Sequence, residues 1–120
     1  MRVEARSGVA TALDVRGLSV ELGKRAIVSD VGLDVPTGVW LCIIGPNGAG
    51  KTTLVHAIAG LLHHTGSVRM WGRPLETRDR RERARTVALV PQLPAIPESF
   101  TVEQYVLLGR TPHLGPLASE

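Results

Sequence analysis

The sequence has 120 residues, of which 43% are hydrophobic, and its net charge is +3. This length allows one small domain or part of a larger one, and the apolar content argues against disorder throughout. No apolar run approaches the roughly 20 residues of a membrane helix, and segment Met1–Ala12 lacks the apolar core of a signal peptide.

The first part of the sequence is expected to form β-structure behind a loose tail at residues 1–11. Strands are predicted at residues 13–15, 18–22, 26–28 and 31–35, where apolar residues recur in a β pattern. After a turn at Pro36–Gly38, the apolar run Val39–Ile44 predicts a buried strand. The only cysteine, Cys42, is interpreted as a small buried residue, which fits a reducing, cytosolic compartment.

Residues 45–53 read Gly-Pro-Asn-Gly-Ala-Gly-Lys-Thr-Thr, a phosphate loop of the form G-x-x-x-x-G-K-[ST]. An apolar strand precedes this loop and a helix, Lys51–Ala59, is predicted to follow, which is the context that the motif requires. The glycines let backbone N–H groups point at phosphate oxygens, and the helix N-terminus adds partial positive charge. Lys51 is predicted to reach the β- and γ-phosphates, and the Thr52 hydroxyl to bind Mg²⁺. The sequence therefore predicts a nucleoside triphosphate site.

The segment after the phosphate loop continues the alternation of helix and strand. The helix is expected to end at Gly60, and a connector over residues 61–66 leads to a strand at Ser67–Trp71. Adjacent histidines in the connector, His63 and His64, suggest a metal site, but such a site needs further ligands. A solvated loop is therefore the preferred interpretation.

An arginine-rich run at residues 78–85 carries much of the positive charge. It could be a nucleic-acid patch, but it contains Asp79 and Glu82 and no aromatic residue. We therefore interpret it as a short, solvated surface helix.

The last third is predicted to contain one strand, one loop and one helix. Residues Thr86–Val90 form a short apolar run that predicts a buried strand, and a proline-rich loop follows at residues 93–100. Thr101 is expected to cap a helix over Val102–Leu108, which Gly109 would stop. Because helices and strands alternate, the predicted fold class is α/β, with a small antiparallel β-region at the front.

Taken together, these motifs resemble the ATP-binding subunit of an ABC transporter. The phosphate loop has the form typical of that family, and Val90-Pro91-Gln92 resembles its Q-loop. The segment Gly109–His113, with the residues before it, is similar to the subgroup that energises import of iron-siderophores, haem or cobalamin. The resemblance extends over residues 13–116.

The resemblance implies a P-loop NTPase core of the RecA-like type, with an antiparallel β-subdomain at the front and the start of a helical subdomain. By this resemblance, residues 12–92 form the N-terminal part of the ATPase domain. Residues 93–120 would begin the helical subdomain, which would be truncated.

The resemblance also assigns roles to individual residues. Lys51 and Gln92 would be catalytic, and Thr52 and Gln92 would contact Mg²⁺, with Gln92 also contacting the attacking water. Many members stack adenine on an aromatic residue where this sequence has Leu22, which offers apolar contact but no π face. The implied ATP-binding residues are Gly45, Pro46, Asn47, Gly48, Ala49, Gly50, Lys51, Thr52, Thr53 and Leu22.

The implied function is ATP hydrolysis coupled to import of a metal chelate. The implied partners are transmembrane permease subunits, a second ATP-binding subunit in a head-to-tail dimer and, indirectly, a periplasmic or extracellular substrate-binding protein. No nucleic acid is expected. The implied location is the cytoplasm, peripheral on the inner face of the cell membrane, and the resemblance does not identify the substrate.

The sequence stops at Glu120, before the signature motif, the Walker B carboxylates and the switch histidine of the family. We therefore expect the 120-residue chain, whether a truncated product or a partial sequence, to bind ATP without hydrolysing it. Its parallel core would have an unpaired edge, so marginal folding or aggregation is expected.

Three alternatives differ in the chemistry that they predict. A non-catalytic nucleotide-binding fragment would bind ATP without turnover. A P-loop kinase would transfer phosphate to a metabolite, although the front β-region and Val90–Gln92 argue against it. An ABC ATPase of another substrate class, such as one acting on nucleic acid, disagrees with the Gly109–His113 tail.

Overall fold

Two long strands, β2 (Thr11–Leu22) and β3 (Arg25–Pro36), pair antiparallel and form the centre of a sheet. The structure is a computed structural model that describes residues 2–3 and 8–115. A tight turn joins the two strands, and Gly23 in it has a φ of 65°, which favours glycine. The four short strands predicted here are therefore continuous in the structure and form one hairpin. The strand pairing shifts register at the points where the alternation of apolar residues is interrupted.

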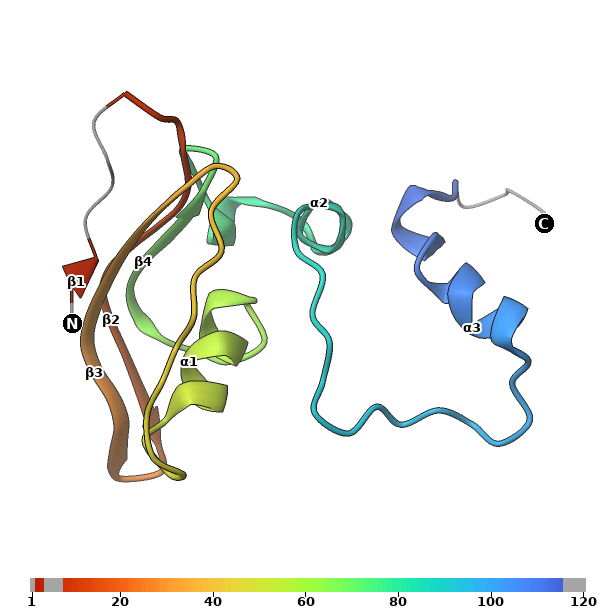
Figure 1. Ribbon diagram of the computed structural model, residues 1–120, viewed down its shortest axis with the longest axis horizontal. Helices are drawn as coiled ribbons and strands as arrows, with labels where there is room; N and C mark the ends of the chain where they lie inside the picture. The colour runs from red at the N-terminus through yellow and green to blue at the C-terminus, as the bar shows by residue number, and fades with distance from the viewer. Residues whose placement is uncertain (1, 4–7, 116–120) are drawn as a thin grey trace. The chain divides into compact units, whose positions relative to one another are not determined.

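Three shorter strands complete the sheet around this hairpin (Figure 1). β4 (Thr65–Met70) pairs antiparallel with β2, and β5 (Arg73–Pro74) pairs antiparallel with β4. β1 (Arg2–Val3) pairs parallel with β3, so the strand order is β1-β3-β2-β4-β5. β1 and the start of β2 differ from the loose tail expected at residues 1–11. Of that prediction, residues 1 and 4–7 lie outside the described part of the chain.

Helix α1 (Lys51–Ile58) packs on one face of the sheet, as Figure 1 shows. Its buried residues, Leu54 and Ala57, are three positions apart and so lie on the same side of the helix. They join a core of apolar side chains from the strands and from the 3₁₀-helix η1 (Leu75–Thr77). The largest fully buried side chains of this core are Leu18, Leu33, Leu75, Val15, Val20 and Val68. The helix predicted after the phosphate loop is thus confirmed, with a sheet beneath it.

Two buried strands predicted from apolar runs are wrong for this structure. Residues 39–44 form no strand, and Trp40 and Ile44 are 100% and 89% exposed. Residues 87–90 form no strand either, and Val90 is 90% exposed. A buried parallel strand needs hydrogen-bonding neighbours. Among the residues that the structure describes, no strand pairs with either segment.

The chain divides into two units, Met1–Arg78 and Asp79–Glu120, and each is described by itself. The second unit contains α2 (Arg80–Thr86), α3 (Val102–Leu108) and the 3₁₀-helix η2 (Thr111–His113). α2 confirms the surface helix predicted in the arginine-rich run, and α3 confirms the helix predicted at Val102–Leu108. Within residues 2–3 and 8–115, no helix combines the length and apolarity needed to cross a bilayer.

Reciprocal capping boxes define where both α-helices of the second unit begin. The Asp79 side chain accepts from the N–H of Glu82, whose carboxylate accepts from the N–H of Asp79. Thr101 and Gln104 make the same pair of contacts at α3, which confirms Thr101 as the cap. Each helix start is therefore encoded within four consecutive residues.

The turn between β4 and β5 contains a strained residue. Its two central residues, Trp71 and Gly72, have φ values of 53° and 75°, both in the left-handed region. A two-residue hairpin with this geometry favours Asn-Gly, whereas a bulky residue at positive φ costs about 1–2 kcal/mol. The Trp71 side chain is more than half exposed, so packing does little to offset that cost.

We therefore expect Trp71→Asn to stabilise the protein by about 1 kcal/mol and to raise Tm by about 4–8 °C. Thermal denaturation followed by circular dichroism measures the shift. Trp40→Asn is the matched control, because Trp40 is fully exposed and its φ is not positive. A Tm for Trp71→Asn at or below that of the unchanged protein would contradict the strain argument.

Candidate functional site

The predicted phosphate loop connects residues 39–44 to α1 and wraps over the start of that helix. Within it, the N–H of Ala49 donates to Pro46 O at 3.2 Å and closes a turn. Gly48 and Gly50 have φ values of 83° and 89°, which a residue with a side chain rarely adopts. The first helical hydrogen bond runs from the Leu54 N–H to Gly50 O at 2.9 Å. The loop therefore curves back on itself immediately before the helix begins.

Gly50 is required at its position by packing as well as by its φ. A Cβ added there would lie 2.9 Å from Ile27 O and 3.2 Å from a methyl of Val28, both in β3. The loop backbone thus rests against the sheet at a point where a side chain has no room. Gly50 is also the N-cap of α1 and has no side chain to accept from the first N–H groups of the helix. These donors remain available to an anion, and the helix N-terminus favours negative charge.

Lys51 places the positive charge of the site. Its Nζ donates to Gly45 O at 2.6 Å and to Pro46 O at 2.8 Å, so the side chain folds back over the loop. An ammonium group has three donors, and two contacts leave one for a phosphate oxygen. Thr52 follows and is exposed. Free N–H groups, an ammonium group and a nearby hydroxyl form a donor set that fits the phosphates of a nucleotide.

Leu22 lies at the same end of the first unit as the phosphate loop. It is the last residue of β2, pairs with Arg25 and is half exposed. The Ile27 backbone, two residues beyond Arg25, meets Gly50 of the loop. In Figure 1 the end of the β2–β3 hairpin accordingly lies beside the loop that precedes α1. An adenine contact by Leu22 stays a prediction.

Two other residues carry predictions from the sequence, Gln92 and Cys42. Gln92 is exposed in the second unit, within residues 87–100, which form no helix or strand. Because Gln92 and the phosphate loop belong to different units, its role at that loop stays a prediction. Cys42 is exposed, so its interpretation as a buried residue is wrong. The cause is the unpaired segment 39–44 in which it lies.

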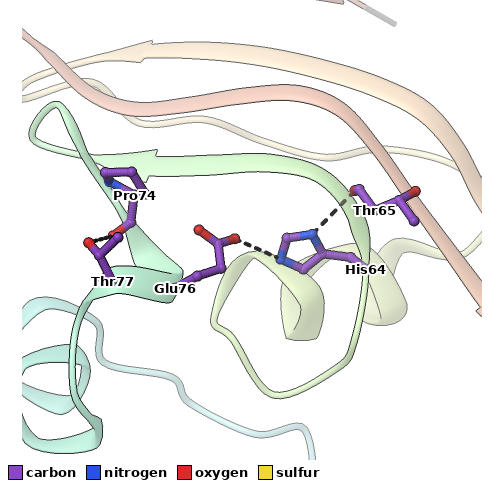
Figure 2. A network of polar contacts seen from close by, with 5 residues as sticks. All are labelled: His64, Thr65, Pro74, Glu76 and Thr77. Carbon is purple, nitrogen blue, oxygen red and sulfur yellow. Dashed lines mark hydrogen bonds and ion pairs between the residues drawn. The ribbon is translucent and has the colours of Figure 1, made fainter.

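The histidine pair in the connector does not form a metal site in the described part of the chain. His63 is exposed, but the His64 side chain is only 9% exposed, so the solvated-loop interpretation fails for His64. Its Nδ1 lies 3.2 Å from Thr65 O, and its Nε2 lies 3.6 Å from a carboxylate oxygen of Glu76 in η1 (Figure 2). No group of three possible metal ligands occurs among the described residues. His64 instead links the connector to η1.

Several proteins of known function are similar to this chain. The hemin import ATP-binding protein HmuV of Pseudomonas entomophila is 43% identical over 102 residues, which are 84% of this chain and 40% of that protein. The iron(3+)-hydroxamate import ATP-binding protein FhuC of Bacillus subtilis is 33% identical, over 85% of this chain and 38% of that protein. The cobalamin import ATP-binding protein BtuD of Halobacterium salinarum is 41% identical, over 84% of this chain and 26% of that protein. The chain therefore spans less than half the length of each of these relatives.

A solved structure of the ATP-binding subunit of an ABC transporter has a TM-score of 0.77 and 29% identity, over 90% of this chain and 44% of that one. This likeness confirms the fold class as part of an α/β P-loop NTPase with an antiparallel sheet. The relatives confirm the resemblance to ATP-binding subunits of importers. The ABC transporter family matches residues 28–114, and because this match covers more than half of the chain, the chain belongs to that family.

Proposed function

We propose that the protein binds ATP with Mg²⁺ and, as part of a full-length subunit, couples ATP hydrolysis to import of a metal chelate. The observation that carries this proposal is the phosphate loop. Its glycines leave the backbone at their positions without side chains, and the Lys51 side chain folds over the carbonyl groups of Gly45 and Pro46. The relatives, all ATP-binding proteins of hemin, hydroxamate or cobalamin import, support the substrate class.

Residues 45–53 hold the triphosphate in this proposal. The N–H groups at the start of α1 donate to phosphate oxygens, and Lys51 adds a charge-assisted hydrogen bond. Thr52 and Gln92 would hold Mg²⁺, which supplies neutralisation of charge on the phosphate oxygens. Gln92 would also orient the attacking water.

The proposed partners follow from importer function. They are transmembrane permease subunits, a second ATP-binding subunit and, indirectly, a substrate-binding protein. The protein would then lie in the cytoplasm, against the inner face of the membrane.

An uptake measurement tests the substrate class. Cells that lack this protein should lose energy-dependent uptake of one labelled compound among hemin, a ferric hydroxamate and cobalamin. The unchanged gene should restore that uptake, and a Lys51→Ala gene should not. Normal uptake of all three compounds without the protein would contradict the proposed substrate class, and ATP binding by the purified protein would test the nucleotide site separately.

An aromatic residue in place of Leu22 is expected to tighten ATP binding. Stacking on a base contributes about 1 kcal/mol, so Leu22→Tyr should lower the Kd for ATP about fivefold. Isothermal titration calorimetry with ATP and with inorganic triphosphate measures the effect. The affinity for triphosphate, which has no base, should stay unchanged. An equal gain for both ligands, or no gain for ATP, would place adenine away from Leu22.

A further inference from the structure

Two arginines of α2 hold the backbone at the end of η2. The Nε of Arg81 and the Nε of Arg85 each donate to Pro112 O at 2.7 Å, and an Nη of Arg81 donates to Leu114 O. The two arginines are four positions apart and therefore share one side of α2. The guanidinium fork suits such contacts because its donors are planar and spaced to reach neighbouring acceptors. We call this pair of arginines the arginine clamp. It connects residues of the second unit that are separated by at least 27 positions in the sequence.

The arginine clamp closes a loop that contains Gln92. Between α2 and α3, residues 87–100 form no helix or strand. Pro91, Pro94 and Pro97 stiffen this segment because proline restricts φ and favours extended backbone. When both ends of a stiff segment are tied, its middle samples fewer positions. The contacts that tie α2 to η2 therefore restrict the conformations open to the segment that contains Gln92.

We propose that Arg81 and Arg85 are positioning residues for Gln92. They tie α2, which precedes the Gln92 segment, to η2, which follows α3, and so limit the positions that the Gln92 side chain can sample. This inference rests on the proposed function, which places Gln92 at Mg²⁺. It also gives two arginines of the run at residues 78–85 a role beyond that of a solvated surface.

Loss of the arginine clamp should loosen the segment without unfolding the two helices. α2 and α3 each have their own capping box, and neither box involves Arg81 or Arg85. The phosphate loop lies in the first unit, and its contacts are with β3 and with its own carbonyl groups. Mg²⁺-dependent steps should therefore change while Mg²⁺-free nucleotide binding is kept.

The test measures binding of mant-ATP, a fluorescent ATP analogue, to the whole protein, first in EDTA and then during titration with Mg²⁺. In the double variant Arg81→Ala/Arg85→Ala, the Mg²⁺ concentration for half-maximal response should rise about tenfold, the size typical of lost support around a metal site. Affinity in EDTA should change less than about twofold by the same reasoning. Arg80→Ala/Arg83→Ala removes equal charge from the same helix and should leave both values unchanged.

Gln92→Ala separates this inference from the proposed function. It should shift the Mg²⁺ response like the clamp variant, and combining the two changes should add little. If Gln92→Ala shifts the response and the clamp variant does not, the inference is overturned and the proposed function stands. If Gln92→Ala has no effect, the proposed role of Gln92 fails and the inference fails with it. If the double variant Arg81→Ala/Arg85→Ala does not fold, the variant Arg81→Lys/Arg85→Lys tests the inference instead. A rise in the Mg²⁺ concentration for half-maximal response supports the arginine clamp, and an unchanged concentration overturns it.

Discussion

Replacing Lys51 with alanine is expected to weaken ATP binding about 100-fold, which corresponds to about 2.7 kcal/mol. The Lys51 Nζ is held over the loop by Gly45 O and Pro46 O. Alanine removes the charged donor that is proposed to contact the phosphates, and it also removes the two hydrogen bonds from Nζ to the loop carbonyl groups. Hydrogen bonds to charged groups contribute about 1.5–3 kcal/mol each, so the estimate corresponds to one or two such bonds.

Calorimetric titration with ATP and with AMP measures this effect. The loss should be much larger for ATP, because AMP lacks the β- and γ-phosphates that Lys51 is predicted to reach. Lys24→Ala is the matched control, since Lys24 is the only other lysine of the sequence and lies exposed in the β2–β3 turn. If both lysine variants lose the same affinity for ATP, Lys51 contributes only through the net charge of the protein. That result would contradict a phosphate site at Lys51.

Gly66→Ala is expected to destabilise the protein by about 3–4 kcal/mol, a large part of the 5–15 kcal/mol that a typical domain has. Gly66 lies in β4 with a φ of 84°. A Cβ added there would be 2.4 Å from Gly17 O and 2.5 Å from Arg16 O. Both acceptors are backbone atoms of β2, which can move only if the β2–β4 pairing is disturbed. The energetic cost of the left-handed backbone and that of the steric overlap thus add together at residue 66.

Gly23→Ala separates these two contributions. Gly23 has a φ of 65° in the β2–β3 turn, and an added Cβ there meets nothing within 4 Å. Gly23→Ala should therefore lower the free energy of unfolding by the backbone contribution alone, about 1–2 kcal/mol. Urea denaturation of both variants gives the two free energies of unfolding. A similar decrease in the free energy of unfolding for both variants would mean that β2 can shift to make room for the Cβ at position 66 with little loss of stability. That result would contradict the steric argument.

Several features of this protein could be predicted because neighbours in sequence encode them. The phosphate loop is nine consecutive residues, and its glycines and lysine lie together in the structure. The starts of α2 and α3 depend on residues three positions apart, as the Asp79 and Thr101 caps show. The β2–β3 hairpin follows from alternation and a glycine turn. Short-range patterns of this kind do not need distant partners.

Other features depend on contacts between distant segments and were missed or mistaken. The arginine-rich run predicted a surface helix but not the contacts of Arg81 and Arg85 with Pro112. The connector pattern predicts a solvated loop, whereas the His64 side chain is only 9% exposed and its Nε2 lies 3.6 Å from a carboxylate oxygen of Glu76 in η1. In each case the partner lies at least 12 positions away, beyond the reach of local patterns.

By itself, the sequence determined the phosphate loop, the helix that follows it and the family to which its motifs point. All three depend on short runs of residues whose backbone preferences and hydrogen-bonding groups are local. Only the tertiary structure decided whether the apolar runs at residues 39–44 and 87–90 form buried strands, and in the described residues they do not. The physical reason is that a strand, unlike a helix, is held by hydrogen bonds from other segments. An apolar run can therefore favour a strand, but a neighbouring strand must be present to form one.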